Sequence, residues 1–258
     1  MWGWIKRIIL GMLVGLVLAL AYVYISYTYT ISKLRDQNPT STSLIDYRIR
    51  EAQARGEQGK RTQTWVPIER ISPFLQRAVL AGEDTNFATH HGFDYEAIQR
   101  AWEDAQREAE KESKQEGEAE DPSIWDWNLP TFKRGASTIT QQLAKNLYLS
   151  NERSFLRKGR EAVITFFLER ELSKRRILEI YLNVIEWGDG IYGAEAASQY
   201  YFKKSAADLT QREAAFLSAM IPSPLNVFNP QKNLKRVQRR QKVILGGMPF
   251  VKMPPGTG

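Results

Sequence analysis

The stretch AVLAGEDTNFATHHGFD, residues 78–94, closes the first helix of the folded part and opens the loop after it. Ser72 as N-cap and Pro73 at the first helical position predict the start of this helix, which ends at two adjacent acids, Glu83 and Asp84. A helix C-terminus repels negative charge, and Asp84 adds like-charge repulsion, so we expect a raised pKa for Glu83. A raised pKa suits a general base. The alternative is a pair of solvated acids that end the helix incidentally.

The loop after these acids contains Phe87, His90, His91 and Gly92. Its residues predict a tight turn in which polar groups and an aromatic ring frame one carboxylate, and this favours the general-base interpretation. The two histidines are interpreted as hydrogen-bonded structural residues. No further His and no Cys exists in the chain to complete a zinc site.

Two features of the composition limit the function. The 258 residues are 43% hydrophobic, enough for one folded domain, and the formal net charge is +7. Residues 103–126 hold ten acids and three bases, so the remainder carries 33 bases against 19 acids, a charge of +14. Such a surface suits phosphate groups, nucleic acid or anionic lipid. The absence of cysteine excludes disulfides and thiolate metal sites.

The N-terminal run IILGMLVGLVLALAYVYISY, residues 8–27, carries no charge and has the length of a transmembrane helix. Lys6 and Arg7 favour a cytoplasmic segment 1–7. The alternative is a cleaved signal peptide, because Ala19-Leu20-Ala21 fits the small-x-small pattern. We favour the retained anchor, since the run is longer than a signal core. Both interpretations export the rest of the chain.

The remaining chain divides by composition. Residues 28–64 are polar and predict a stalk, residues 65–248 a folded domain, and residues 249–258 a tail. Within the domain, the acidic segment 107–130 predicts an insertion or mobile flap. Apolar residues recur at helical spacing, and long period-2 alternation is absent from the sequence, so the fold class is mainly α.

A second candidate site is KRGASTITQQLAKN, residues 133–146. Arg134 and its neighbour Lys133 precede a predicted helix that begins at Ser137, and cations beside free helix N-terminal amides bind phosphate. The polar face that follows is uncharged apart from Lys145, which suits a sugar or a diphosphate. An ordinary capped amphipathic helix is the alternative.

A third candidate site lies in residues 155–183. Arg157 and Lys158 precede Glu161 by four and three residues, so a helix places the three side chains on one face. Glu161 would then stay ionised and orient the two cations. A surface ion-pair cluster explains the pattern equally well.

Together these segments resemble glycosyltransferase family 51. EDTNFATHHGFD resembles its first motif, RGASTITQQLAKN its second and RKGRE its third, while KRRILEIYLN, GDGIYGAEAASQYYF and LTQREAAFLSAMIPSP resemble its later blocks. The resemblance covers residues 65–245, and one anchor with one such domain is the pattern of monofunctional biosynthetic peptidoglycan transglycosylases. It implies a lysozyme-like bilobal helical domain, with a head and a membrane-proximal jaw, behind one N-terminal transmembrane helix.

The resemblance also implies roles for single residues. Glu83 would be the base that takes the proton of the acceptor 4-hydroxyl, and Glu161 would organise the cations around the donor diphosphate. Lys145, Arg157 and Lys158 match positions that contact this diphosphate. Positions that shape the pocket fall on Asp84, Phe87, His90, Ser137, Thr138, Gln141, Gln142 and Asn146.

The implied reaction joins lipid II into β-1,4-linked glycan strands with inversion and release of undecaprenyl diphosphate. No cofactor is required, with room for Mg²⁺ or Mn²⁺ at the diphosphate. The implied partners are lipid II, the growing strand, membrane lipid and cell-wall synthesis or division proteins, but no nucleic acid. The implied location is the bacterial inner membrane, with the domain on the periplasmic side. Ser-x-x-Lys and Lys-Thr-Gly do not occur in the sequence, so we expect no cross-linking activity.

Two rival functions remain open. A lytic enzyme that cleaves peptidoglycan would also use an isolated glutamate in a lysozyme-like fold, but it needs neither a diphosphate site nor a membrane anchor. An inactive cell-wall scaffold is the other rival, although the motif residues that we can place are all present. The basic run KNLKRVQRRQKVILGG, residues 232–247, is interpreted as a solvated face or a helix lying on anionic lipid.

Overall fold

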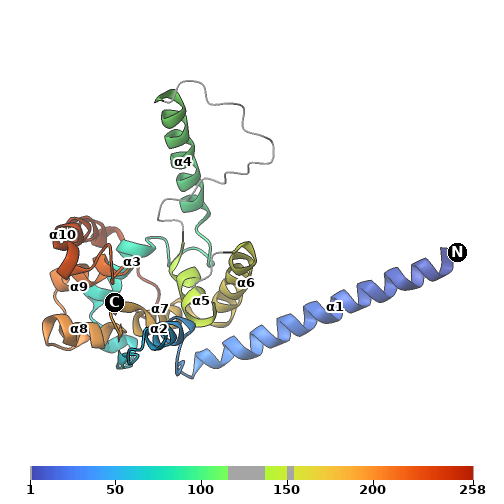
Figure 1. Ribbon diagram of the computed structural model, residues 1–258, viewed down its shortest axis with the longest axis horizontal. Coiled ribbons are helices and arrows are strands. Elements are labelled where there is room, and N and C mark those ends of the chain that lie inside the picture. Colours follow the sequence, from blue (N-terminus) through green and yellow to red (C-terminus); the bar gives the residue numbers. More distant parts are fainter. Residues whose placement is uncertain (1, 116–136, 150–153, 258) are drawn as a thin grey trace.

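The computed structural model describes residues 2–115, 137–149 and 154–257, and these are mainly α-helical (Figure 1). The α-helices are α1 (Trp2–Ser32), α2 (Ser43–Ala54), α3 (Pro73–Glu83), α4 (Tyr95–Gln115), α5 (Ile139–Tyr148), α6 (Phe155–Glu171), α7 (Lys174–Val184), α8 (Ala194–Phe202), α9 (Gln211–Met220) and α10 (Pro230–Gly247). The 3-10 turns are η1 (Lys33–Arg35), η2 (Ile68–Arg70), η3 (Ala206–Asp208) and η4 (Met248–Phe250). The prediction of a mainly α fold is confirmed.

A small sheet accompanies the helices. Its strands are β1 (Thr62–Gln63), β2 (Glu186–Gly188) and β3 (Ile191–Tyr192), in the order β1-β3-β2. β3 pairs in parallel with β1 and antiparallel with β2. The sheet therefore ties the segment after α2 to the hairpin after α7.

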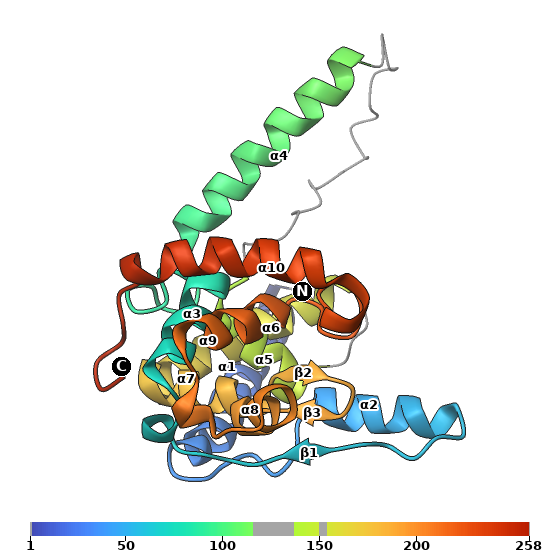
Figure 2. The same cartoon turned by 90° about the vertical axis from the view of Figure 1, so that its left-hand side faces the viewer.

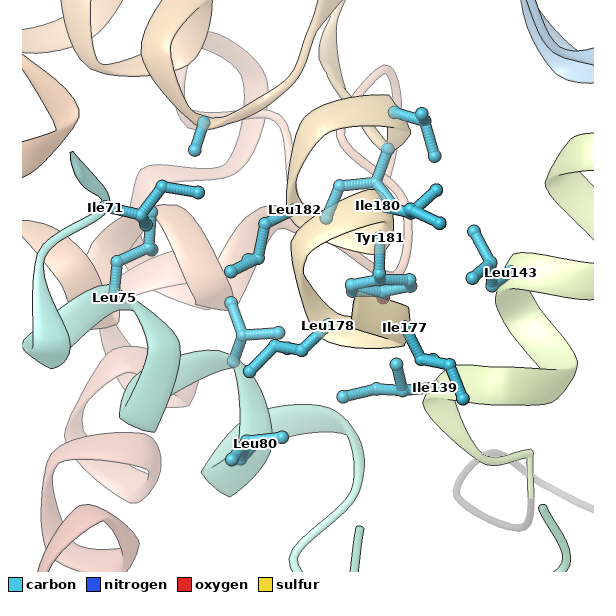
Figure 3. Packing of buried hydrophobic residues seen from close by; sticks show 14 of the residues in the cluster. Ile71, Leu75, Leu80, Ile139, Leu143, Ile177, Leu178, Ile180, Tyr181 and Leu182 are labelled. Carbon is cyan, nitrogen blue, oxygen red and sulfur yellow. The ribbon is translucent and has the colours of Figure 1, made fainter. Parts of the chain in front are cut away.

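Helix α7 forms the centre of the core (Figure 3). Ser173 caps its N-terminus by accepting a hydrogen bond from the backbone of Arg176, as its sequence position predicts. Figure 3 shows Leu178 and Leu182 facing α3, while Ile177 and Tyr181 face the start of α5. A helix that is apolar on most of its circumference belongs in the interior, and truncating one such Leu to Ala costs about 2–5 kcal/mol.

Most of the other helices pack in two groups on either side of α7. In the first group, α3, α9 and α10 contact one another. In the second group, α5 contacts α2 and α6, and α6 contacts α1. Gly82 permits the close approach within the first group, because a Cβ atom there would lie 2.7 Å from Ser218 Oγ. The seam between the two groups contains the candidate site described below.

Helix α1 extends away from the rest of the molecule (Figure 1). It is long and apolar enough to cross a membrane. Its last turns pack on the domain, where Tyr24 and Tyr27 lie 5.6 and 5.4 Å from the ring of Phe167 in α6 and Ile31 is fully buried. The apolar run predicted from the sequence thus continues, without a break, into a contact with α6.

The prediction of a stalk over residues 28–64 is wrong for the part that forms α2. Thr42 caps this helix, Ile45 is fully buried, and the Ser43 hydroxyl donates to the carbonyl of Leu147 at 3.1 Å. Arg48 pairs with Glu186 through two hydrogen bonds. A few apolar side chains and matched charges suffice to dock a polar segment, which a reading of average polarity overlooks.

Helix α4 projects from the domain (Figure 2). Asp94 opens it by accepting a hydrogen bond from the Ala97 backbone at 2.8 Å. The helix continues to Gln115, so the first part of the predicted insertion 107–130 is helical. The rest of that insertion lies outside the described residues.

Candidate active site

Glu83 is the last residue of α3, and it faces a cavity of about 550 Å³ at the seam between the two helix groups. Its side chain is 8% exposed. The cavity walls include five of the predicted site residues: Glu83, Ser137, Gln142, Lys145 and Asn146. The structure therefore brings the end of α3 and the polar face of α5 to one cavity.

Two side chains hold the Glu83 carboxylate. Gln142 Nε2 donates to Oε2 at 3.0 Å, and Arg240 Nη2 donates to Oε1 at 2.8 Å. Arg240 also donates to the carbonyl of Gly82 at 2.7 Å, so it grips the end of α3 at two points. The carboxylate is thus fixed by α5 on one side and α10 on the other.

Burial raises the pKa of Glu83, while the charge of Arg240 and the hydrogen bonds from Gln142 and Arg240 oppose the rise. The raised pKa agrees with the direction expected from the sequence, but the main cause differs. Desolvation dominates because the side chain is enclosed at the seam, and repulsion from Asp84 is only a small contribution. The local pattern predicted the sign, and tertiary packing supplies most of the effect.

Asp84 turns away from the cavity and binds the N-terminus of α5. Its Oδ2 accepts from the backbone N–H of Ile139 at 2.9 Å, and both of its oxygens lie within 3.0 Å of His90 Nε2. The Gly92 N–H donates to His90 Nδ1 at 3.1 Å, so in the neutral ring Nε2 carries the proton and donates to Asp84. A carboxylate at the positive end of a helix dipole is favourable. Asp84 and His90 therefore couple the two helices.

Phe87 is fully buried and packs the loop after α3 against the domain. The Lys174 ammonium lies 4.4 Å from the centre of its ring and pairs with Glu169 at 2.8 Å. The Thr140 hydroxyl donates to the same carboxylate at 2.5 Å. These contacts fasten the loop to α5, α6 and α7, and like Asp84 and His90, Phe87 is outside the cavity lining.

Helix α5 begins at Ile139, two residues later than the sequence suggested. Thr138 is its N-cap, and it forms a capping box with Gln141. The Thr138 hydroxyl also donates to the carbonyl of Gly92 at 2.8 Å. Because this register fixes the helix face, Gln142, Lys145 and Asn146 lie three and four residues apart on the side that lines the cavity.

The side chain of Glu161 is also buried, with 5% of it exposed. Arg157 and Lys158 pair with it at 2.8 and 2.5 Å from the preceding turn of α6, as the spacing predicts. These three residues do not line the cavity, but they act electrostatically on Lys145, which does. Although the Lys145 side chain is solvent-exposed, the enclosing protein lowers its pKa, the positive charges of Arg157 and Lys158 add to this, and Glu161 opposes it.

Sequence reasoning missed Arg240 and Tyr181. The run 232–247 was expected to be a solvated or lipid-facing helix, yet Arg240 reaches Glu83. Val237, Arg240 and Ile244 share one face of α10, and Val237 and Ile244 are buried. The helical spacing of these two apolar residues is the sequence signal that would have placed this face against the domain. Arg240 Nε is buried and has no hydrogen-bond partner among the described residues, so one donor remains for a ligand.

Tyr181 completes the support of the carboxylate from the core side. Its hydroxyl donates to Gln142 Oε1 at 2.7 Å, which orients the Gln142 amide so that Nε2 faces Glu83. Tyr181 is fully buried, and burial raises its pKa well above the usual value. The hydroxyl therefore acts as a neutral donor. Its position inside an apolar helix gave no sign of this role in the sequence.

Arg134 lies outside the described residues, so its place relative to the cavity stays a prediction. Within residues 2–115, 137–149 and 154–257, no group of three or more His, Cys, Asp or Glu side chains is arranged to hold a metal ion. The protein side chains described here do not by themselves form a metal site.

The fold and site define a helical domain that follows a helix long and apolar enough to cross a membrane, with a buried carboxylate and a lysine lining one cavity. The sequence model of the transglycosylase family matches residues 50–117 and 125–249. The chain is 42% identical to the biosynthetic peptidoglycan transglycosylase of Thiobacillus denitrificans over 98% of both chains. It is 40% identical to the protein of that name from Azoarcus sp. over 99% of both, and 38% identical to that from Dechloromonas aromatica over 97% of both.

The chain therefore belongs to the transglycosylase family, the glycosyltransferase family 51 that its motifs resemble. The lysozyme-like helical fold that the resemblance implied is confirmed with it. Family membership also makes the chain an enzyme that transfers glycosyl groups.

Proposed function

We propose that this protein polymerises lipid II into β-1,4-linked glycan strands and releases undecaprenyl diphosphate. One observation carries the proposal: the buried Glu83 carboxylate and Lys145 line the same cavity, and Lys145 is coupled electrostatically to Arg157, Lys158 and Glu161. A base for the acceptor and a cation for the departing diphosphate would then line one cavity, with two further cations coupled to that lysine. The names of the relatives, biosynthetic peptidoglycan transglycosylases, support the substrate class.

In the proposed reaction, Glu83 takes the proton of the acceptor 4-hydroxyl. The oxygen attacks the donor anomeric carbon from the face opposite the diphosphate, so the configuration inverts, and the anomeric carbon–oxygen bond breaks with its electron pair leaving on the phosphate. Burial supports this role by raising the proton affinity of Glu83, while Arg240 and Gln142 keep the carboxylate oriented.

The leaving diphosphate gains negative charge as the bond breaks, so fixed cations would lower the barrier without protonating it. Lys145 is placed for this role in the cavity. Glu161 holds Arg157 and Lys158 in one orientation, as a positioning residue. Among the described residues, carboxylates and imidazoles do not group into a site for a divalent cation. Mg²⁺ or Mn²⁺ bound by diphosphate oxygens stays a hypothesis for the chelator experiment below.

We further propose that α1 is a retained single-pass anchor in the bacterial inner membrane and that the domain lies on the periplasmic side. α6 supports this placement. It packs on α1 and exposes Phe155, Leu156 and Phe166, with 86%, 83% and 52% of their surfaces accessible. An apolar surface beside a spanning helix suits the boundary of a bilayer, where a lipid-linked substrate would be reached.

The test is an assay of the full-length protein in detergent micelles with purified lipid II, with and without a chelator. Glycan products are resolved by length. We expect an inverted, linear, uncross-linked polymer and no cleavage of mature glycan. Consumption of mature glycan without polymer formation would establish a lytic enzyme instead. Turnover of neither substrate would leave the scaffold function, with its cell-wall partners, as the better account.

A further inference from the structure

Helix α5 carries residues from both parts of the proposed site. Gln142 holds the carboxylate of Glu83, the proposed base. Lys145, on the next turn of the same helix, lines the same cavity and is coupled electrostatically to Glu161 in α6. A shift of α5 along its axis would move the Gln142 and Lys145 side chains together. The position of α5 therefore sets the geometry both at the base and among the cations around Glu161.

Helices α5 and α6 lie side by side (Figure 1). Thr140, in the first turn of α5, contacts Glu169 near the end of α6. Lys145, further along α5, is coupled to Glu161 near the start of α6, so the two helices run in opposite directions. Both helices also contribute apolar side chains to the core. Burial of apolar surface is non-directional, so it fixes the position of one helix along the other less sharply than a hydrogen bond does.

A single hydrogen bond joins α5 to α6 among the described residues. The Thr140 hydroxyl donates to Glu169 Oε1 at 2.5 Å. Thr140 is fully buried, and 7% of the Glu169 side chain is exposed. A hydrogen bond requires a defined distance and angle, and one to a carboxylate is about twice as strong as one between neutral groups. This contact therefore favours one position of α5 along α6.

Glu169 is held by two other elements. Lys174 Nζ, from the first residue of α7, donates to the same Oε1 atom at 2.8 Å. The loop after α3 packs on the Glu169 stem, since a Cβ atom at Gly92 would lie 3.0 Å from Glu169 Cγ. A buried carboxylate that loses its partners is strongly destabilising. Glu169 is therefore a fixed reference point against which the Thr140 hydroxyl places α5.

We propose that the Thr140–Glu169 hydrogen bond fixes the position of α5 along α6, and that Thr140 and Glu169 are positioning residues for glycosyl transfer. The inference rests on the proposed function, because it matters to the reaction through the roles given there to Glu83 and Lys145. An α-helix rises about 1.5 Å per residue, and a misplacement of about 1 Å costs on the order of 100-fold in rate. Without the hydrogen bond, small shifts of α5 would misplace Gln142 and Lys145 at once.

Thr140→Val tests the proposal, because it removes the hydroxyl and keeps the shape of the side chain. Thr165→Val is the matched control: Thr165 is fully buried in α6, and its hydroxyl has no hydrogen-bond partner among the described residues. With purified lipid II and full-length protein in micelles, we expect Thr140→Val to lower kcat/KM at least about tenfold and Thr165→Val to leave it within about twofold. Thr140→Ser, which restores the hydroxyl, should recover most of the rate. Equal rates for the two valine variants would overturn the proposal.

A double-mutant cycle with Glu161→Gln separates positioning from a general loosening of the core. In that background the cations have already lost the charge that orients them, so the position of Lys145 relative to them matters less. Thr140→Val should then lower kcat/KM by less than about threefold, because residues that act through one geometry are not additive. The same tenfold loss in both backgrounds would contradict the positioning role.

Hydrogen exchange separates this proposal from the proposed function, because it needs no substrate. In the full-length protein in micelles, we expect Thr140→Val to speed exchange of the α5 backbone at least about threefold relative to α9, which packs in the other helix group. Thr165→Val should not do so. Equal changes in α5 and α9 would overturn the role of the hydrogen bond in placing α5. A wild-type protein that makes no polymer would instead overturn the polymerase function and leave the exchange result in force.

Discussion

Glu83 and Glu161 are held in opposite ways. Glu161 takes its partners from the preceding turn of its own helix, with Arg157 and Lys158 four and three residues away. Glu83 takes Gln142 and Arg240 from helices 59 and 157 residues further along the chain. One carboxylate belongs to a local motif, while the other exists in its environment only once the two helix groups have packed.

This difference separates two kinds of role. A local ion-pair cluster can keep its geometry through small movements of the domain, which suits a group that orients cations. The burial of a carboxylate at the seam changes with the packing of α3, α5 and α10, and its pKa changes with its burial. This sensitivity suits a base whose proton affinity depends on burial. Substitutions at the seam should therefore affect pH dependence, and substitutions in the cluster should affect use of the donor.

The largest effect is expected for Glu83→Gln. The amide keeps the shape of the side chain but cannot accept the proton, and positioned general bases contribute about 10²–10⁴-fold to rates. We expect polymer formation from lipid II to fall by roughly 10³-fold in an assay of purified full-length protein. Circular dichroism and Tm should show a folded protein. A variant that keeps the wild-type rate would remove Glu83 from the mechanism.

Glu161→Gln should produce the next largest loss, on the order of 10²-fold, because two cations lose the charge that orients them and then repel each other and Lys145. The loss should appear mainly in kcat/KM for the lipid-linked donor. Glu103→Gln, which alters an exposed pair with Arg107 on α4, is the control and should change nothing. Equal effects of both variants, or a Glu161→Gln protein that fails only in stability, would contradict the positioning role.

Arg240→Ala tests the long-range partner of Glu83, the proposed base. Arg240 holds the pKa of Glu83 down against the effect of burial, so its loss raises that pKa further. Because the base acts when ionised, the acidic limb of the pH–rate profile should move to higher pH, with a rate about tenfold lower near neutrality, or about 1.4 kcal/mol. Arg239→Ala, an exposed neighbour on α10, should leave the profile in place.

Arg240→Ala should also change how the stability of the protein depends on pH. The folded-state pKa of Glu83 lies above its usual value, so the native state binds the proton more tightly than the unfolded chain. Stability is therefore lost as pH rises from the unfolded pKa through the folded one. Arg240→Ala should deepen this loss in chemical unfolding measured across that range. If its destabilisation were the same at every pH, coupling to Glu83 would be ruled out.

These partners show how far the sequence could lead. The cap at Ser72 and the i,i+4 spacing predicted α3 and the Glu161 cluster, because the residues that determine them lie within one or two turns. Arg240 could not be paired with Glu83 in this way, since their contact depends on how α10 packs across α3. The pKa of Glu83 shows the same limit: the direction of its shift was predicted, but the main cause, burial, is a tertiary property.

The docking of α2 is a second feature that local sequence patterns did not predict. Average polarity over residues 28–64 suggested a stalk, yet Ile45 and the pair of Arg48 with Glu186 dock α2 onto the domain, and Arg48 and Glu186 line the cavity that contains Glu83. Single apolar residues and charges with distant partners carry little weight in a window average. They determine the packing nevertheless.

The smallest effect, and the sharpest test of the seam, is expected for Tyr181→Phe. This change removes only the hydroxyl that orients Gln142, so it should cost about 1 kcal/mol of stability and lower kcat severalfold. Tyr201→Phe is the matched control. Its hydroxyl donates to the carbonyl of Trp187 at 2.9 Å, away from Glu83, so its loss should cost similar stability without changing kcat. If both variants lowered kcat alike, the loss would reflect general loosening of the core, and the chain from Tyr181 through Gln142 to Glu83 would have no specific part in catalysis.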